Sequence, residues 1–221
     1  MINCLLWDID GTLIDTTELI VQALDTTFKT FMGTSLSVNG LRDLIGIPLK
    51  EQMLVLGDPA EHGVDVGEME RHCIHYYESN RQLERVIPGS IEALKRGFER
   101  GWSTALVTSK NHPEIANTLP RLGIDKYLTA VVTADDVANP KPDPESVVKA
   151  LALCGAKPGE ALFIGDTVHD IRAGQGAGVR TIGVLWGAGR RESLDLIAPD
   201  YICELPEDLW SLIVGIAATK P

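Results

Sequence analysis

The sequence has no long apolar run and no apolar leader at its start. No stretch of about 18 apolar residues occurs, so the sequence predicts no membrane-spanning helix. The first residues, MINCLLWDID, carry no basic segment followed by a long apolar one, which is what a secretory signal requires. We therefore expect a cytoplasmic protein that has no membrane partner.

Cysteine and positive charge are both scarce. The four cysteines, Cys4, Cys73, Cys154 and Cys203, form no C-x-x-C pair, so neither a disulfide framework nor a zinc site is predicted. The chain has 20 Lys and Arg against 31 Asp and Glu, for a formal net charge of −11. That charge argues against a nucleic-acid partner, whose phosphates need a basic surface. A small anion can still bind where local positive groups hold it.

What is present is the composition of a globular enzyme-sized chain. The 221 residues are 44% hydrophobic and 23% charged, which suits one large or two smaller domains. We find no internal repeat, and the sequence leaves the oligomeric state open between monomer and homodimer. The last residues, GIAATKP, read as a frayed end.

Two kinds of periodicity divide the chain. Residues 16–82 show helical spacing with few strand-like runs, as in LIVQALDTTFKTFM. From residue 87 onward apolar runs such as STALVTS and ALFIGDT alternate with amphipathic helices, a pattern typical of parallel βαβ units. We therefore predict an α/β fold, a Rossmann-like doubly wound parallel sheet formed by residues 1–15 and 83–221, with an all-helical domain inserted at residues 16–82.

The segment DIDGT follows the apolar run CLLW, which reads as a buried strand. Asp8 and Asp10 are two residues apart, so on a strand they would point to the same side. Two carboxylates about 5 Å apart repel by roughly 3 kcal/mol at an effective dielectric constant near 20. A plain polar turn would also contain Asp and Gly, but the repulsion between the two carboxylates suggests that a cation belongs there.

Polar residues follow the other predicted strands as well. Thr108 and Ser109 follow TALV, Lys141 lies in NPKPDP after TAVVTAD, and Asp166 and Asp170 follow LFIG. The carboxyl ends of parallel strands share one edge of a sheet, where ligands bind. Asp8, Asp10 and Asp166 together offer the oxygen ligands that suit Mg²⁺, and Lys141 could neutralise both an attacking aspartate and a phosphoryl oxygen.

Four segments resemble the four motifs of the haloacid dehalogenase superfamily in their order and in their strand context: DIDGT, VTS, the Lys of NPKPDP and GDTVHD. The resemblance implies that Asp8 is the nucleophile that becomes an aspartyl phosphate and that Asp10 is the general acid and base. It also implies that Thr108, Ser109, Gly11 and Lys141 serve the phosphoryl group. Mg²⁺ would be bound by Asp8, Asp166 and the backbone carbonyl of Asp10, with Asp170 supporting the metal waters.

The insert at residues 16–82 is similar to the cap domain of that family. LIGIPL, Lys110 of VTSK and GVLWG at residues 183–187 resemble the phosphoglycolate phosphatase branch. The expected substrate is thus a small phosphorylated metabolite. A sugar phosphate mutase resembling beta-phosphoglucomutase, an inorganic pyrophosphatase of the same superfamily and, more remotely, a non-catalytic binding module remain open.

Two segments have no assigned role at this point. RHCIHYY places His72, His75, Tyr76 and Tyr77 in the insert, where we favour a solvated helix face over a substrate site. AGQGAG places Gly174, Gly176 and Gly178 in a predicted helix, although glycine inside a helix costs about 1 kcal/mol relative to alanine.

Overall fold

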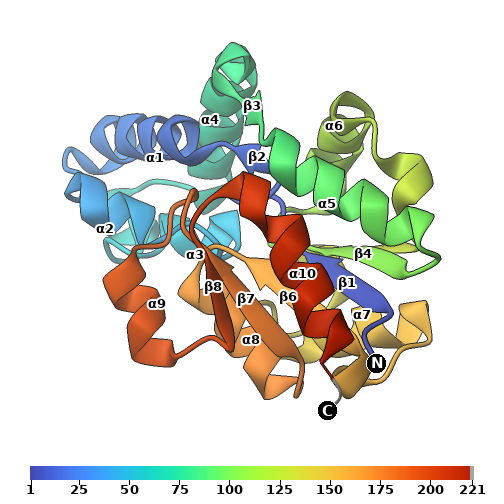
Figure 1. Cartoon of the computed structure of the whole chain (residues 1–221). Coiled ribbons are helices and arrows are strands. Elements are labelled where there is room, and N and C mark those ends of the chain that lie inside the picture. The colour runs from blue at the N-terminus through green and yellow to red at the C-terminus, as the bar shows by residue number, and fades with distance from the viewer. Residues whose placement is uncertain (220–221) are drawn as a thin grey trace.

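A parallel sheet of six strands is the centre of the molecule in the computed structural model, which describes residues 1–219 (Figure 1). The strand order is β5-β4-β1-β6-β7-β8, and every neighbouring pair is parallel. The strands are β1 (Cys4–Trp7), β4 (Ser103–Val107), β5 (Ala130–Val132), β6 (Ala161–Gly165), β7 (Arg180–Val184) and β8 (Tyr201–Cys203). This confirms the doubly wound parallel sheet that the alternating pattern predicts, and β8 is a strand that the sequence analysis did not identify.

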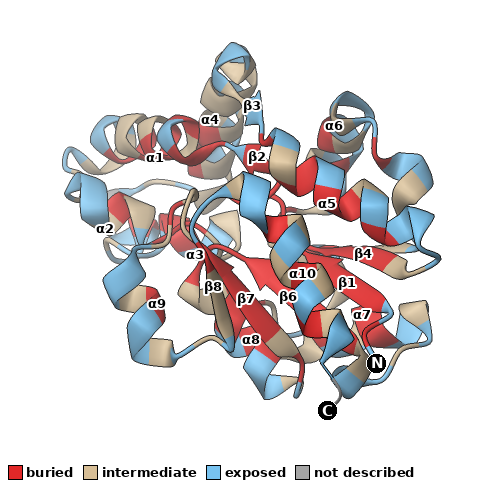
Figure 2. Ribbon diagram, viewed as in Figure 1, coloured by how far each residue is buried: buried red, intermediate tan, exposed pale blue. Residues whose placement is uncertain are grey.

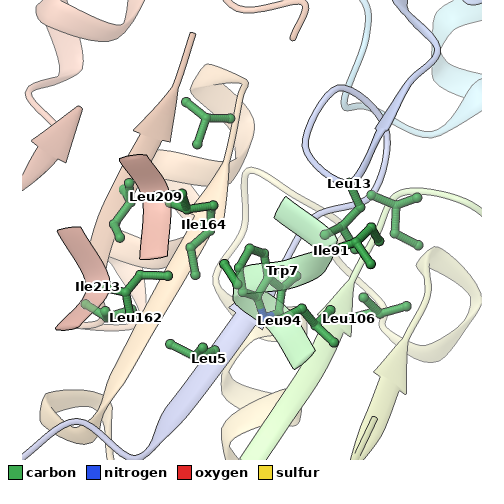
Figure 3. Close-up of a cluster of buried hydrophobic side chains, with 14 of the residues drawn as sticks. Leu5, Trp7, Leu13, Ile91, Leu94, Leu106, Leu162, Ile164, Leu209 and Ile213 are labelled. Atoms are coloured by element: carbon green, nitrogen blue, oxygen red, sulfur yellow. The ribbon is translucent and has the colours of Figure 1, made fainter. Parts of the chain in front are cut away.

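Both faces of the sheet are covered because successive side chains of a strand point to opposite sides. From β1, Leu5 and Trp7 join a core cluster with residues of α5 (Pro88–Glu99) and α10 (Leu209–Ala218), as Figure 3 shows. Cys4 and Leu6 face the other side, toward α7 (Glu145–Cys154) and α8 (Val168–Gly176). Helices α6 (His112–Leu122) and α9 (Arg191–Ile197) complete the core, and Figure 2 shows the buried strands inside outward-facing helix surfaces.

The insert leaves and re-enters the core at one place. Strand β2 (Ile14–Asp15) pairs antiparallel with β3 (Arg85–Val86), with Ile14 opposite Val86. Between them lie α1 (Thr17–Met32), α2 (Val38–Arg42), α3 (Leu49–Met53) and α4 (Val66–Ser79), with the 3-10 turns η1 (Pro59–His62) and η2 (Arg81–Leu83). Further 3-10 turns in the core are η3 (Asp125–Tyr127), η4 (Ala134–Asp136), η5 (Pro158–Glu160) and η6 (Pro206–Asp208).

The insert has an apolar core that is largely its own. Leu24 and Phe28 of α1 pack in one cluster with Met53 and Met69. Among the buried members of this cluster, Ala188 comes from the core and the others come from the insert. Helix α1 ends at Gly33, whose φ of 67° is the left-handed conformation that favours glycine at a helix end. The segment can therefore hold its shape largely through its own packing.

Packing explains the glycines of AGQGAG. A Cβ on Gly174 would lie 2.6 Å from Cγ2 of Thr181 and 3.2 Å from the ring of Phe163, so glycine lets α8 lie close against the sheet. Gly176 ends α8, and Gly178 follows it with a φ of 71°. The helix cost expected from the sequence is thus offset by close helix–sheet contact.

The frayed end predicted for GIAATKP is wrong for its first residues. Gly215 to Ala218 belong to α10, and Ile216 is buried in the core. Lys220 and Pro221 lie outside the described residues. No helix within residues 1–219 has the length and apolar character needed to cross a membrane.

Candidate active site

The carboxyl ends of three adjacent strands bring the predicted site residues together. Asp8, Thr108 and Asp166 follow β1, β4 and β6, and β1 lies between the other two in the sheet. The backbone N–H of Asp8 donates to the carbonyl of Ile164 at 2.9 Å, so the chain is still held in the sheet where the carboxylate projects. All three side chains are buried.

Lys141 reaches into this group from the loop before α7. Its Nζ donates to Oδ1 of Asp8 at 2.7 Å, to Oδ1 of Asp170 at 2.6 Å and to the carbonyl of Val107 at 3.2 Å. The side chain is 1% exposed. Burial alone would lower the pKa of Lys141, but the carboxylates of Asp170 and Asp8 raise it overall. The lysine is thus a fixed buried cation beside Asp8.

Three buried carboxylates lie around this single cation. Asp8, Asp166 and Asp170 each have a carboxylate oxygen that lies within 4.8 Å of such an oxygen in the other two residues. Burial, followed by repulsion between the carboxylates, raises the pKa of Asp8 well above its ordinary value and that of Asp166 to about 7. This set of hard oxygen donors with excess negative charge fits Mg²⁺.

Asp166 and Asp170 are both held by local hydrogen bonds. Oδ1 of Asp166 accepts from the Thr12 hydroxyl at 3.1 Å, and its Oδ2 accepts from the backbone N–H of Ala188 at 2.7 Å. Oδ2 of Asp170 closes a capping box at the start of α8 by accepting from the N–H and hydroxyl of Thr167. Asp170 therefore both caps α8 and binds Lys141, which leaves its carboxylate little freedom.

Glycines allow the chain to approach Asp166 closely. A Cβ on Gly11, whose φ is 78°, would lie 2.3 Å from Oδ2 of Asp166, and one on Gly187 would lie 2.2 Å from the same atom. A Cβ on Gly189 would lie 1.7 Å from the Asp166 carbonyl oxygen. Gly11 thus has a steric reason to be glycine beyond any role toward a phosphoryl group.

Asp10 is oriented differently from the other aspartates. It is half-buried, its Oδ2 lies 2.8 Å from Nζ of Lys110, and its Oδ1 accepts from the Thr16 hydroxyl at 2.9 Å. Its carboxylate therefore lies outside the cluster formed by Asp8, Asp166 and Asp170. A metal role for Asp10 through its backbone carbonyl, as the family resemblance implies, does not require that side chain.

Thr108 and Ser109 differ in what their hydroxyls contact. Oγ1 of Thr108 is buried and accepts from the backbone N–H of Lys110 at 3.2 Å. The hydroxyl of Ser109 donates to the carbonyl of Gly46 in the insert at 2.5 Å. A substrate role for Ser109 remains a prediction, and in this conformation its proton is directed at the insert.

A cavity of about 80 Å³ lies between the core and the insert. From the core it is lined by residues that include Asp8, Asp10, Thr108 and Lys110. From the insert it is lined mainly by apolar side chains, among them Ile20, Ala23, Ile45, Leu49 and Ile74, together with Tyr77. Both aspartates of DIDGT therefore face the same small cavity.

The residues of RHCIHYY have different surroundings: some line the cavity and others contact residues within the insert. Tyr77 lines the cavity, whereas His72 lies 3.0 Å from the Thr27 hydroxyl and Tyr76 donates to Gln22. His75 is exposed. The interpretation of this segment as a solvated face holds for His75 and not for Tyr77.

Sequence reasoning missed two groups at the site. It noted Lys110 only as a branch resemblance, and it gave no role to the backbone N–H of Ala188. The signal for Ala188 was the pair of flanking glycines in WGAG, which is typical of a close backbone approach. For Lys110 the signal was a lysine directly after the hydroxyl motif, a position at the same strand end as Thr108.

Comparison with known proteins agrees with this geometry. The profile of the family described as "Haloacid dehalogenase-like hydrolase" matches residues 5–184. Pyrophosphatase PpaX of Bacillus velezensis is 35% identical over 208 residues, which is 94% of each chain.

The solved structures agree at the level of the fold. The crystal structure of a hydrolase from Pseudomonas syringae superposes with a TM-score of 0.85 at 24% identity, covering 97% of this chain and 99% of that one. A "predicted phosphoglycolate phosphatase" from Haemophilus somnus superposes with a TM-score of 0.82 at 23% identity, covering 96% and 98%. With the strand-end aspartates and the buried lysine in place, the chain belongs to the haloacid dehalogenase-like hydrolases.

Proposed function

We propose that the protein is a Mg²⁺-dependent phosphatase that hydrolyses a small phosphomonoester through an aspartyl phosphate on Asp8. The observation that carries the proposal is the position of Asp8. Its carboxylate lines the cavity and is held by the buried Lys141, while Asp10 lines the same cavity from the next turn of the chain. A nucleophile and a separate proton donor therefore share one small space.

Asp8 is suited to covalent catalysis. In the first displacement one carboxylate oxygen forms a bond to phosphorus while the bond from phosphorus to the leaving-group oxygen breaks, and Asp10 gives that oxygen a proton. In the second, Asp10 takes a proton from water as the water oxygen attacks phosphorus, which releases phosphate and restores the Asp8 carboxylate. The two-step route divides a very slow hydrolysis into two easier reactions.

Lys141 and Thr108 support these steps. The buried ammonium group holds one oxygen of Asp8 at 2.7 Å, which fixes the direction of the other oxygen and offsets part of the negative charge. Thr108 lines the cavity at the end of the neighbouring strand, where its hydroxyl can bind a phosphoryl oxygen. Alignment and charge neutralisation of this kind are the main contributions to phosphoryl transfer.

Asp8 and Asp166 would hold Mg²⁺ together with the backbone carbonyl of Asp10, and Asp170 would support the waters on the ion. The raised pKa values of Asp8 and Asp166 support this assignment, because such carboxylates need a cation to remain ionised near neutral pH. When bound, Mg²⁺ supplies positive charge to the phosphoryl oxygens and keeps Asp8 ionised.

The insert, residues 16–82, would serve as a cap that excludes water and selects the leaving group. Its Gly46 carbonyl accepts from Ser109, and its Asp43 pairs with Arg190 of the core at 3.1 Å. The cavity of about 80 Å³ is well below the roughly 300 Å³ at which typical ligand pockets begin. This size favours a leaving group such as glycolate over a sugar or a nucleoside.

Inorganic pyrophosphate is a second candidate substrate. The relative that is 35% identical along 94% of both chains carries the name pyrophosphatase, and pyrophosphate is also small. A sugar phosphate mutase is a weaker candidate because the small cavity favours a small leaving group. All of these reactions use the same nucleophile, so the substrate must be found by measurement.

The test uses the purified protein with Mg²⁺ and four substrates: phosphoglycolate, pyrophosphate, ethyl phosphate and glucose 6-phosphate. We expect phosphate release from the first or second at least 10-fold faster than from glucose 6-phosphate, reflecting the small cavity. Acid-quenched protein should carry one phosphoryl group on Asp8, detected by mass spectrometry of the peptide. If none of the four released phosphate, the proposal would be contradicted, and conversion of glucose 6-phosphate to glucose 1-phosphate without phosphate release would favour the mutase.

A further inference from the structure

The loop after β4 sends consecutive side chains to different parts of the site. Thr108 lines the cavity at the end of the strand, the Ser109 hydroxyl donates to the Gly46 carbonyl of the insert, and Nζ of Lys110 pairs with Oδ2 of Asp10 at 2.8 Å. The cavity, the insert and the carboxylate of Asp10 are thus joined by three successive residues. Lys110 has no part in the function proposed above.

Lys110 is an unusual lysine because its side chain is only 8% exposed. Its Nζ lies 5.0 Å from the centre of the Tyr77 ring, within the range of a cation–π interaction. Burial alone would lower the pKa of Lys110, but Asp10, followed by Tyr77 and Glu114, raises it overall. The ammonium group is therefore charged, enclosed and directed at Asp10.

The carboxylate of Asp10 is held at both oxygens. Thr16 donates to Oδ1 at 2.9 Å, and Lys110 approaches Oδ2 at 2.8 Å. Thr16 directly precedes α1, the first helix of the insert, so its hydroxyl contacts Asp10 instead of capping that helix. An aspartate held from two sides has little freedom to rotate, which fixes the hydrogen-bond geometry on which proton transfer depends.

Tyr77 connects this arrangement to the position of the insert. It lies on α4, its hydroxyl donates to Glu84 in the returning linker, and Glu84 pairs with Arg121 on core helix α6. The ring is thereby fixed to the core while it covers Lys110. Moving α4 away from the core would uncover the ammonium group and weaken its hold on Asp10.

We propose that Lys110 is a positioning residue: covered by Tyr77 of the docked insert, it fixes the carboxylate of Asp10 where the leaving group must be protonated. Docking of the insert and placement of the proton donor are then one event. The inference rests on the proposed function, since it assigns to Asp10 the protonation of the leaving group. Its test is designed so that the two proposals fail in different ways.

The decisive variant is Lys110→Met, which keeps the length of the side chain and removes its charge. Three substrates separate the possible roles. Ethyl phosphate has a strongly basic leaving group and no second charge, acetyl phosphate has a weakly basic leaving group, and phosphoglycolate has a strongly basic leaving group with a carboxylate. Lys29→Met is the matched control, because Lys29 is paired with Asp25 on an exposed face of α1.

A positioning role predicts a kcat for Lys110→Met that is about 10- to 100-fold lower on ethyl phosphate and on phosphoglycolate alike, with KM changed by less than about threefold. On acetyl phosphate the loss should be several times smaller, because acetate needs little protonation to leave. Lys110→Arg, which retains the charge, should regain part of the loss on ethyl phosphate. The Lys29→Met control should show no such dependence on the leaving group.

Three other results would overturn the inference. A rise in KM confined to phosphoglycolate would make Lys110 a ligand for the substrate carboxylate, and equal losses on all three substrates would indicate only damage to the site. The double variant Lys110→Met with Tyr77→Leu should be no slower than Lys110→Met alone, whereas multiplied losses would contradict the link through Tyr77. If the unmodified protein hydrolyses none of the three, the proposed function fails first.

Discussion

Replacing Asp8 with asparagine should stabilise the metal-free protein while it abolishes catalysis. Oxygens of Asp166 and Asp170 lie within 4.8 Å of Asp8, and at an effective dielectric constant near 20 each repels it by about 3 kcal/mol or more. Attraction to Lys141 at 2.7 Å contributes about 6 kcal/mol in the other direction. The summed repulsion from the two carboxylates is slightly larger than the attraction to Lys141, and burial also removes the water that would solvate an ionised Asp8. Both effects make the charge of Asp8 unfavourable in the folded, metal-free protein.

The asparagine side chain can preserve most of the local geometry. The structure gives Asp8 one side-chain hydrogen bond, from Lys141 to Oδ1, and an amide oxygen can accept the same bond. Near pH 8 Asp8 is ionised in the unfolded chain, so folding must either bury that charge beside two other carboxylates or protonate a group whose pKa is raised by burial; asparagine avoids both costs. We therefore expect Asp8→Asn to raise the free energy of unfolding by about 1–3 kcal/mol in EDTA near pH 8.

The assay is urea unfolding of both proteins, in EDTA and in Mg²⁺, with phosphate release measured in parallel. Mg²⁺ should stabilise the original protein and have much less effect on Asp8→Asn, because one ligand is gone. The control is Asp25→Asn, which changes the net charge equally at an exposed pair with Lys29 and should alter stability by less than about 0.5 kcal/mol. An Asp8→Asn protein that is less stable than the original in EDTA would refute the electrostatic argument.

Three further predictions concern the same site. Chelation with EDTA should abolish phosphate release, and added Mg²⁺ should restore it, as followed in a continuous phosphate assay; full turnover in metal-free buffer would contradict the assignment of the ion. The pKa of Asp166 is raised from 3.8 to about 7 in the folded protein, so this group contributes stability at low pH that is lost as pH rises through about 7. Between about pH 5 and about pH 8 the loss in the free energy of unfolding amounts to at most about 3 kcal/mol, measured by urea unfolding in EDTA. A stability that does not fall over this interval, once acid unfolding by other groups is corrected for, would count against it. Gly11→Ala should lower the free energy of unfolding by more than about 2 kcal/mol and weaken Mg²⁺ binding, because the new Cβ would lie 2.3 Å from Asp166. The control Gly33→Ala has a similar φ and open space around it, so it should lower the free energy of unfolding by only about 1 kcal/mol and leave turnover unchanged.

The strand ends were predictable from sequence because their signals are local. Each signal lies within ten residues: DIDGT follows the apolar run CLLW, and Asp166 follows LFIG. Parallel strands then bring these ends to one edge of the sheet. The strand β8 was missed because YIC is short and has only one neighbour in the sheet. The pairing of Lys110 with Asp10 was also missed, since it joins residues from two different strand ends.

The interior of the insert was harder to predict than its existence. Helical periodicity marks residues 16–82 as helical, but periodicity does not say which face of α4 meets the core. That choice depends on the packing of α4 against α1 and on the docking contacts of Gly46 and Asp43, which are distant in sequence from their partners. Tyr77 and His75 lie on the same helix, and only the three-dimensional arrangement distinguishes the residue in the cavity from the exposed one.

The short pair of β2 and β3 has a consequence for how such a protein can change over evolution. Because Ile14 lies opposite Val86, the two ends of the insert are held side by side. The entropic cost of closing this loop is met by the strand pairing and grows only slowly with the length of the insert. The residues in between can be lengthened, shortened or exchanged without shifting the register of the central sheet. The insert can therefore vary in length and sequence while the sheet keeps its register, provided that the few contacts that reach the strand ends, such as Tyr77 over Lys110, are kept.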